Sequence, residues 1–387
     1  MKDHSRAPAE LKRFMLLFAL AWAGGAVAYV PFLTILLPLR VVGLAGGSSV
    51  RLLALTTFCG AIAASTGNIL FGWLSDRTGR RLPWIATGLV LTTALLLGVS
   101  LARSPVELIV VIVCWQLALN MMLGPLSALA ADNVPARKTG LLGGLMALSP
   151  ALGALSGVIV TLPALGGPDQ RLGAVALMVV ACVLPVLFFG KGREAPHASI
   201  AAEDERRPFP FVMWLARLLL QIAEAALFAY LLLYFRSLDS AIEESRIARL
   251  FSAVLVLAVP VAMLAGRWAD RSEHPKRVLA AFAFCSAIGL LAMSAAANVG
   301  QASAAYVGFG LATTVFLSLH SGQTLRVLPN ALQRGRDLGL FNLTNTLPSI
   351  IMPVLAAAIV PTAGFPVLLR VLAVMSFLSS FLLFWAR

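Results

Sequence analysis

The sequence predicts an all-α polytopic membrane protein with twelve transmembrane helices, arranged as two six-helix bundles related by an internal repeat. Its composition, its long apolar runs and a repeated loop all indicate this class. The 387-residue chain is 59% hydrophobic and 12% charged, about half the charged fraction of roughly 25% that is usual in soluble domains. Its mean hydropathy is +0.90. A chain of this composition is typical of a protein that crosses the bilayer many times.

Apolar runs of about 20 residues are long enough to cross a hydrocarbon core of roughly 30 Å as helices. The first run is too long to be the core of a signal peptide, so we expect it to remain as the first span. Twelve runs are predicted as spans, at residues 14–38, 52–74, 83–103, 106–130, 139–163, 172–190, 211–236, 247–266, 278–298, 303–327, 338–361 and 365–385.

The longest hydrophilic stretch, KGREAPHASIAAEDERRPFP, divides the twelve spans six and six. Its prolines, its mixed charge and its lack of apolar periodicity are typical of a linker. We therefore expect an N-terminal six-helix bundle over residues 1–190, a central cytoplasmic linker over 191–210 and a C-terminal six-helix bundle over 211–387.

Two landmarks recur in corresponding spans of the two halves. GWLSDRTGRR follows the second span and GRWADRSEHPKR follows the eighth, so that Asp76 and Asp270 are 194 residues apart. Pro150 in span five and Pro348 in span eleven are 198 residues apart. Two landmarks at nearly the same offset indicate that the six-helix bundle is duplicated.

The distribution of charged residues predicts how the chain is oriented in the membrane and excludes some classes of function. Most of the 30 Lys and Arg residues fall in segments on the same side as the N-terminus, which predicts that this side, with both termini, is cytoplasmic. The basic residues are scattered between apolar runs, so the net charge of +13 does not indicate a nucleic-acid partner. No nucleophile lies beside a base, and the cysteines lie inside spans without metal-ligand spacing. The sequence therefore predicts neither an enzyme nor a metal or cofactor site.

The loop GWLSDRTGRR resembles the signature loop of the major facilitator superfamily, G-x-L-x-D-R-x-G-R-R/K, and GRWADRSEHPKR resembles a degenerate second copy. The resemblance extends over the whole chain through the twelve spans, the inside termini and the long central loop. It implies two bundles around a central cavity that opens alternately to each side of the membrane.

The chemistry of this loop supports a gate. Charge-assisted hydrogen bonds between its side chains and a neighbouring helix end would exist in only one of two conformations. The alternative, that the arginines only anchor the loop at the cytoplasmic face, explains neither the aspartate nor the glycines. The predicted gating residues are Gly72, Asp76, Arg77, Gly79, Arg80 and Arg81, with Asp270 and Arg271 in the second copy.

The continuation RRLPWI is similar to the same loop in the sugar:cation symporters of the superfamily. Sodium-coupled members carry aspartates in span two, whereas TTFCGAIAASTGNILFG has none, with Asn68 as the nearest polar residue. Drug:proton antiporters carry an arginine in span four, which VIVCWQLALNMMLGP lacks, and SPALGA in span five matches their motif only loosely. The resemblance therefore favours proton-coupled symport.

Glu224 is the one acidic residue deep inside an apolar run, where an unpaired charge costs roughly 2.5–3.5 kcal/mol on insertion scales. Arg217, Gln221 and Glu224 share one face of span seven, a span that resembles the cavity-lining helices of the superfamily. Desolvation favours the neutral form of a carboxylate, so Glu224 is predicted to load a proton outside and release it inside, where Arg217 favours the ionised form. The alternative is a fixed network with an arginine of another helix.

His320 in span ten is the other predicted proton-coupling group, with Gln323 on its face. Amide side chains both donate and accept hydrogen bonds, which suits neutral hydroxylated ligands, and aromatic rings can stack on a sugar. Hydrogen bonding between helices explains buried amides equally well. The predicted substrate contacts are Tyr29, Trp115, Gln116, Asn120, Gln221, Gln323, Asn342 and Asn345.

We therefore expect a secondary active transporter of the bacterial inner (plasma) membrane that imports a small polar solute, such as a saccharide, together with protons. Proton-coupled export of drugs or metabolites is the alternative, since Glu224 could bind a cationic drug. A non-transporting receptor or assembly factor of the same fold is a third, which the intact signature loop disfavours. The expected partners are a small-molecule substrate, protons and the lipid bilayer, with no nucleic acid, and the protein is expected to be a monomer.

Overall fold

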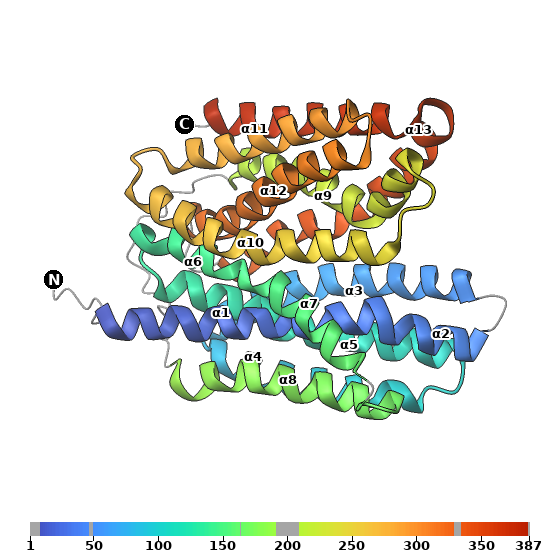
Figure 1. Ribbon diagram of the computed structural model, residues 1–387. Coiled ribbons are helices and arrows are strands. Elements are labelled where there is room, and N and C mark those ends of the chain that lie inside the picture. Colours follow the sequence, from blue (N-terminus) through green and yellow to red (C-terminus); the bar gives the residue numbers. More distant parts are fainter. Residues whose placement is uncertain (1–7, 46–48, 163, 191–208, 329–333, 386–387) are drawn as a thin grey trace. The chain divides into compact units, whose positions relative to one another are not determined.

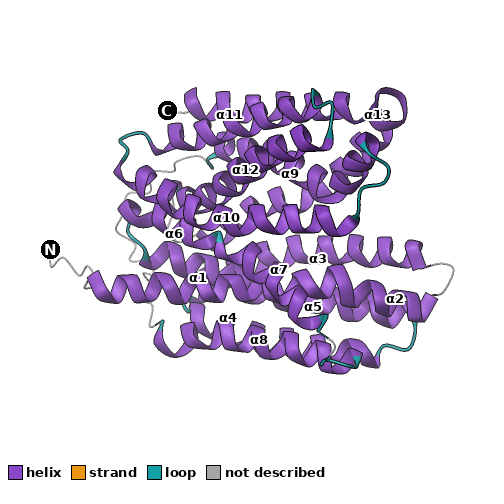
Figure 2. Ribbon diagram, viewed as in Figure 1, coloured by secondary structure: helices purple, strands orange, loops and turns teal. Residues whose placement is uncertain are grey.

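The computed structural model describes residues 8–45, 49–162, 164–190, 209–328 and 334–385. Within these ranges every regular element is a helix (Figures 1 and 2). Twelve helical stretches are long and apolar enough to cross a membrane, and they follow the predicted spans in order, at Ala9–Leu44, Leu55–Thr78, Arg81–Leu101, Pro105–Asn133, Thr139–Val160, Pro168–Phe189, Phe211–Leu238, Arg249–Arg271, Pro275–Ser294, Val299–Val327, Gly335–Ala356 and Ala358–Trp385. The predicted fold class is confirmed. Residues 191–208 of the predicted linker lie outside the described residues.

The chain divides into two compact units. The first unit comprises Met1–Pro135, Leu148–Pro208 and Leu328–Asn342, and the second comprises Ala136–Ala147, Phe209–Val327 and Leu343–Arg387. One short segment from each predicted half therefore packs with the other half, namely residues 136–147 and, among the described residues, 334–342.

The first unit contains eight of the labelled helices with two short irregular turns between them. They are α1 (Pro8–Pro31), the π-helical turn η1 (Phe32–Leu36), α2 (Leu37–Ala45), α3 (Ser49–Thr78), α4 (Arg81–Gly98), the 3₁₀ turn η3 (Val99–Leu101), α5 (Pro105–Asn133), α7 (Leu148–Val160), α8 (Pro168–Phe189) and the first turns of α13 (Arg334–Trp385). The helix α5 packs between α3 and α4, and α1 packs against α7 and α8.

The second unit contains the remaining helices and most of α13. They are the 3₁₀ turn η4 (Ala136–Lys138), α6 (Thr139–Met146), α9 (Phe211–Leu238), α10 (Glu244–Arg271), α11 (Pro275–Ser294) and α12 (Val299–Val327). The helix α12 packs against α6, α9, α10 and α11. Gly143 of α6 and Gly322 of α12 permit the closest approach, since a Cβ atom on Gly143 would lie 2.5 Å from the carbonyl oxygen of Ser318.

Local sequence explains where several of these helices begin and bend. The hydroxyl of Ser104 accepts the backbone N–H of Glu107 at 3.2 Å and Pro105 occupies the first turn, so α5 begins at a capped N-terminus. The long helix α13 is interrupted at Gly364, whose φ of 75° lies in the left-handed region. This bend separates the eleventh and twelfth predicted spans. Pro31 leads into η1, and π turns of this kind are frequent at functional sites.

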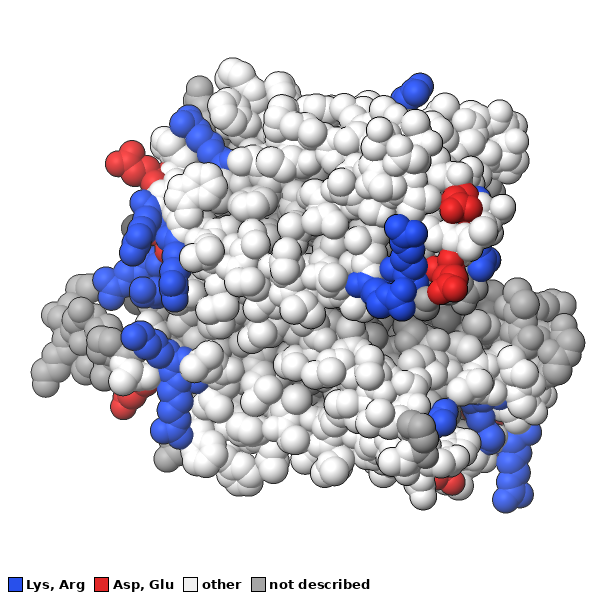
Figure 3. Space-filling model, viewed as in Figure 1, with Lys and Arg blue, Asp and Glu red and all other residues white. Residues whose placement is uncertain are grey.

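The surface has charged side chains at the helix ends and apolar side chains between them, as expected of helices that cross a membrane. On the face shown in Figure 3, the Lys, Arg, Asp and Glu side chains lie near helix ends and the surface between them is uncharged. Large apolar side chains, including Val90, Leu177 and Phe228, are exposed on the helices themselves. An exposed apolar surface of this kind is matched to lipid rather than to water.

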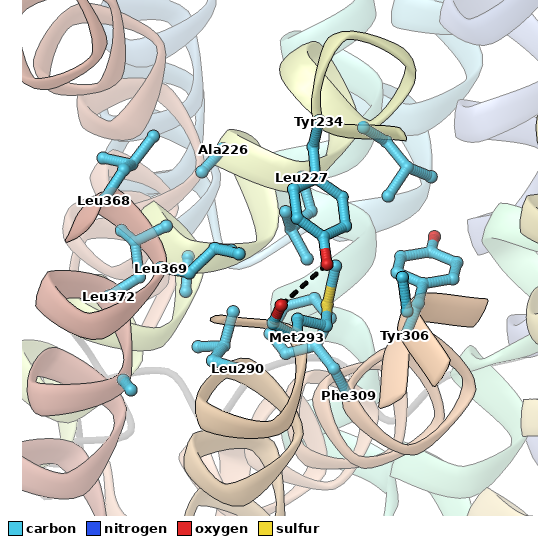
Figure 4. Close-up of a cluster of buried hydrophobic side chains, with 14 of the residues drawn as sticks. Ala226, Leu227, Tyr234, Leu290, Met293, Tyr306, Phe309, Leu368, Leu369 and Leu372 are labelled. Atoms are coloured by element: carbon cyan, nitrogen blue, oxygen red, sulfur yellow. Dashed lines mark hydrogen bonds between the residues drawn. The ribbon is translucent and has the colours of Figure 1, made fainter. Parts of the chain in front are cut away.

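The core of the second unit joins four helices around Tyr234 (Figure 4). Leu227 and Tyr234 of α9 pack with Met293 of α11, Phe309 of α12 and Leu369 of α13. The hydroxyl of Tyr234 donates a buried hydrogen bond of 2.7 Å to the carbonyl oxygen of Met293. This bond ties α9 to the last turn of α11 inside an otherwise apolar cluster.

We expect Tyr234→Phe to destabilise the protein by about 1 kcal/mol, because the carbonyl of Met293 loses a buried partner while the ring packing is kept. Tyr230→Phe is the matched control, since Tyr230 packs against the same cluster and its hydroxyl has no hydrogen-bond partner among the described residues. The measurement is the unfolding temperature of the purified protein in detergent. Equal shifts in the two variants would contradict the assigned bond.

Candidate functional site

The predicted gate loop lies between α3 and α4. The helix α3 ends at Thr78, and Gly79 follows with a φ of 65° and donates its N–H to the carbonyl oxygen of Asp76 at 3.3 Å. A left-handed residue in this position terminates a helix, and glycine adopts it without strain. Gly79 therefore ends α3 and leads the chain towards α4, and Asp76 lies in the last turn of α3.

Asp76 caps the N-terminus of α13 within the first unit. One carboxylate oxygen accepts the backbone N–H of Gly335 at 3.1 Å and the other accepts that of Arg336 at 3.1 Å. The first N–H groups of a helix have no partner within it and carry partial positive charge, so a carboxylate there is stabilised twice. Arg81 completes the cap with an ion pair of 2.6 Å to the Asp76 carboxylate.

Arg81, the first residue of α4, joins this cap to α5. Its side chain is buried, and it forms a second ion pair of 3.1 Å with Asp132 at the end of α5. It also donates to the hydroxyl of Ser75 at 2.6 Å. Its Nε and Nη1 atoms bind the two carboxylates, whereas its Nη2 atom is buried and has no hydrogen-bond partner among the described residues. Asp132 could not be predicted as a partner of Arg81, because the two residues are 51 positions apart and no local pattern links them.

The second copy of the loop repeats the arrangement within the second unit. The carboxylate of Asp270, in the last turn of α10, accepts the N–H groups of Gly140 and Leu141, both at 2.8 Å. These two residues are in the first turn of α6. Two aspartates 194 residues apart therefore make the same contact with the first turn of another helix.

Each cap depends on a pair of facing glycines. Gly72 is one turn before Asp76, and a Cβ atom on it would collide with the carbonyl oxygen of Gly335. Gly266 is one turn before Asp270, and a Cβ atom on it would collide with the carbonyl oxygen of Gly140. Gly72 was predicted from the sequence, whereas the glycines of the capped helices, Gly140 and Gly335, were not. The feature that could have identified them is a second glycine four residues later, Gly144 after Gly140 and Gly339 after Gly335, a spacing typical of close helix contacts.

The other predicted gating residues lie outside the two caps. Arg77 is exposed and its guanidinium lies 4.0 Å from the centre of the Trp73 ring. Arg80 is exposed at the position before α4, and Arg271 is exposed at the end of α10. Of the predicted arginines, Arg81 is the one that the described residues bury in a cap.

Arg217 of α9 is held by neutral groups from two other helices of the second unit. Its Nη1 donates to the hydroxyl of Ser321 at 2.8 Å and lies 3.5 Å from Nδ1 of His320, both in α12. Its Nη2 donates to the side-chain oxygen of Asn345 in α13 at 3.3 Å. The Nε atom is buried and has no hydrogen-bond partner. The structure thus brings three predicted residues together and adds Ser321, which the sequence analysis missed.

Glu224 lies two turns further along the same face of α9. Its carboxylate accepts a hydrogen bond of 2.8 Å from the amide of Gln221, and the amide oxygen of Gln221 is buried without a partner. Among the described residues, Glu224 makes no ion pair within 4.0 Å and no further hydrogen bond. Arg217, Gln221 and Glu224 each keep part of their surface exposed.

The imidazole of His320 is fully buried, and its contacts fix its tautomer. Its Nε2 lies 3.0 Å from the carbonyl oxygen of Met213. A carbonyl only accepts, so Nε2 carries the proton and Nδ1 is the acceptor. The Nδ1 atom faces Arg217 and the hydroxyl of Thr324, the latter at 3.2 Å. This arrangement suits a neutral imidazole that accepts from a guanidinium.

The predicted substrate contacts fall into two groups. In the first unit, Asn120 accepts a buried hydrogen bond of 3.0 Å from Asn68, Gln116 is buried beside them on α5, and Trp115 packs edge-on against Phe32 with its indole N–H unpartnered. Tyr29 is exposed on α1 and Asn342 is half-buried on α13. In the second unit, the buried Gln323 has an amide nitrogen without a partner. Asn120 is thus explained by contact between helices, while Trp115 and Gln323 have hydrogen-bonding capacity to spare.

Residues 213–387 match the family model described as the Major Facilitator Superfamily. A sequence search of curated proteins finds no match. The matched family consists of transporters rather than enzymes.

Solved structures extend the likeness to nearly the whole chain. A bacterial homologue of the iron transporter ferroportin, in its outward-facing state, superposes with a TM-score of 0.74 over 97% of this chain and 98% of that chain, at 17% identity. The human organic anion transporter MFSD10 gives 0.75 over 98% and 100%, at 14% identity. The proton:xylose symporter XylE gives 0.74 over 96% and 94%, at 15% identity. The chain therefore has the fold of major facilitator superfamily transporters.

We expect Gly72→Ala to break the cap on α13, because the added methyl group forces α3 away from Gly335. Hydrogen exchange of the Gly335 and Arg336 amides should then accelerate about tenfold or more, since each loses a hydrogen bond to a charged group. Gly266→Ala should instead accelerate exchange at Gly140 and Leu141. Gly98→Ala is the control, because a Cβ atom there meets nothing within 4 Å. Equal exchange in all three variants would contradict the role of the glycines.

Proposed function

We propose that this protein is a secondary active transporter of the major facilitator superfamily that works by alternating access, is coupled to protons at Glu224 and imports a small polar solute. The observation that carries the proposal is the pair of aspartate caps. Asp76 and Asp270 each bind the first turn of another helix through hydrogen bonds that are lost when the helices separate. Contacts of this kind distinguish two conformations rather than stabilise both.

The caps act as gates under this proposal. By span count, α3 and α10 are even-numbered spans and end at the same membrane face, which the distribution of Lys and Arg predicts to be cytoplasmic. Formation of both caps closes that face, and their loss opens it. The facing glycines allow the helix backbones to meet when the caps are formed, so that little water can pass between them.

Glu224 supplies the proton coupling. Its carboxylate lies in an apolar span with Gln221 as its one hydrogen-bonding neighbour among the described residues. The amide of Gln221 can donate to a carboxylate or accept from a carboxylic acid after its two ends exchange. Both protonation states are thereby accommodated, which a carrier requires. The alternative of a fixed ion pair with an arginine finds no support among the described residues.

The substrate class follows less directly from the fold. The xylose symporter of the same fold moves a sugar with protons, whereas the ferroportin homologue and MFSD10 are named for iron and organic anions. Saccharide import is the class suggested by the RRLPWI loop. Export of a cationic drug is the second candidate, and the observation that favours it is that Glu224 makes no ion pair within 4.0 Å among the described residues. The proposal also includes a monomer in the bacterial inner membrane with cytoplasmic termini.

We expect Glu224→Gln to abolish accumulation of substrate driven by a pH gradient while sparing exchange of labelled for unlabelled substrate, because exchange needs no net proton movement. The measurement uses proteoliposomes that contain a pH-sensitive dye, to which mono- and disaccharides and lipophilic cations are added in turn. Glu273→Gln, at an exposed carboxylate beyond α10, is the control. Retained accumulation against a gradient in Glu224→Gln would remove the carrier role.

We expect Asp76→Asn to slow turnover about tenfold while changing the dissociation constant of a bound solute less than about twofold, because the variant weakens charge-assisted bonds worth roughly 1.5–3 kcal/mol each in the closed gate alone. Asp270→Asn should have the same effect, and the double variant a larger one. Transport rates in proteoliposomes and binding to the purified protein provide the two readouts. Unaltered turnover in both single variants would contradict the gating role.

A further inference from the structure

The geometry points to a small monocarboxylate as the substrate, bound by the guanidinium of Arg217. This inference rests on the proposed function and names the substrate class of the same site. Arg217 is a positive charge inside a transmembrane helix, and the contacts that hold it are all neutral: Ser321, His320 and Asn345. A cation whose hydrogen-bonding partners are all neutral is offset only through space by Glu224, and only while Glu224 is ionised. An anion that enters from solution would compensate it.

One edge of the guanidinium, which includes the buried Nε atom, makes no hydrogen bond with the described residues. Nη1 is occupied by Ser321 and His320, and one proton of Nη2 is occupied by Asn345. The donors that remain are Nε–H, which has no partner, and the second proton of Nη2. In this inference Asn345 takes the Nη2 proton that points away from Nε, so Nε–H and the remaining Nη2 proton are parallel and form the fork that a carboxylate accepts in a bidentate manner. Two neighbouring sugar hydroxyls can also accept from this fork, but they are neutral and bring no charge to offset the guanidinium.

The three neutral partners orient the fork. Ser321 and His320 hold one side of the guanidinium from α12, and Asn345 holds it from α13. His320 cannot turn away, because its Nε2–H is bonded to the carbonyl oxygen of Met213. His320 is therefore a positioning residue for Arg217 in this inference. It fulfils this role as a neutral imidazole that accepts a hydrogen bond, without gaining or losing a proton.

The protonation state of Glu224 determines how much negative charge can bind beside Arg217, and it favours a substrate with a single negative charge. When Glu224 is ionised, it is the nearest described negative charge on the face of α9 that carries Arg217, and it repels an entering anion. When Glu224 is protonated, Arg217 requires a single counter-charge, which a monocarboxylate supplies without excess. Proton binding at Glu224 and anion binding at Arg217 therefore favour each other, and the coupling is reciprocal. A dianion would leave one charge unpaired.

The experiment measures dissociation constants of the purified full chain for matched probes at a mildly acidic and a mildly alkaline pH. The probes are acetate, lactate and benzoate, their neutral amides acetamide, lactamide and benzamide, and glucose. Methyl phosphate and methanesulfonate distinguish a carboxylate from other oxyanions. We expect at least one carboxylate to bind, its amide to bind about ten- to a hundredfold more weakly, and the carboxylate to bind more tightly at the acidic pH.

Variants separate the two roles. Arg217→Gln should lose the preference for the carboxylate over its amide, and Arg217→Lys should keep the charge but lose the preference for carboxylate over sulfonate, because a lysine has no fork. Glu224→Gln should bind the carboxylate equally at both pH values. Arg249→Gln, at an exposed arginine of α10, is the control, and the unfolding temperature of each variant checks that it is folded.

Three results would overturn the inference: that no carboxylate binds to the unmodified protein, that the amides bind as tightly as the acids, or that Arg217→Gln keeps the preference while folded. If glucose instead drives proton uptake that depends on Glu224, the proposed function stands and the monocarboxylate does not. If a carboxylate binds at Arg217 and moves no protons, the binding site stands and the proton coupling does not.

Discussion

The structure depends on how the first turn of a helix is satisfied where little water is present. Backbone N–H groups at a helix N-terminus have no partner in their own helix, and an unsatisfied group costs several kcal/mol in hydrocarbon. Asp76 and Asp270 solve this problem at α13 and α6 with a carboxylate from another helix. This contact requires the two helix backbones to approach closely. Glycines therefore lie one turn before each aspartate, at Gly72 and Gly266, and in each capped helix, at Gly335 and Gly140. Arg81 then neutralises the cap on α13 and ties it to α5.

The charged residues on the polar face of α9 differ from those of the cap on α13, because they are not joined in ion pairs. At the cap on α13, the charges of Asp76, Arg81 and Asp132 are paired and their hydrogen bonds are short. On α9, Arg217 and Glu224 share a face without an ion pair within 4.0 Å among the described residues, and neutral groups hold each of them. Charges that are already paired gain little from a new ligand, whereas charges without an ion pair can bind a substrate ion or a proton. This contrast favours a structural and switching role for the caps and a binding role for α9.

Much of the fold could be predicted because membrane spans are specified by length and apolarity alone, and these can be counted along a sequence. Asp76 and Gly79 could be predicted because a carboxylate and a left-handed glycine have side-chain or backbone signatures at fixed positions. The partners of the caps could not, because a backbone N–H is carried by every residue except proline, and only the spacing of Gly140 and Gly335 from second glycines distinguishes them. Ser321 and Asp132 escaped for a related reason, since contact between distant spans leaves no local pattern.

The strength of the caps fits the energy that a substrate can supply. Each cap has two charge-assisted hydrogen bonds to backbone N–H groups, and a net value of roughly 1.5–3 kcal/mol for each, with the exchange for water already included, gives about 3–6 kcal/mol per cap. Coupling energies between sites are typically about 1–3 kcal/mol, and a shift from one dominant conformation to the other needs about 5.5 kcal/mol of differential binding. A proton at Glu224 together with an anion at Arg217 can provide energies of this size. A gate built from a large apolar interface could not be opened by so small a ligand, whereas one built from a carboxylate and a few N–H groups can.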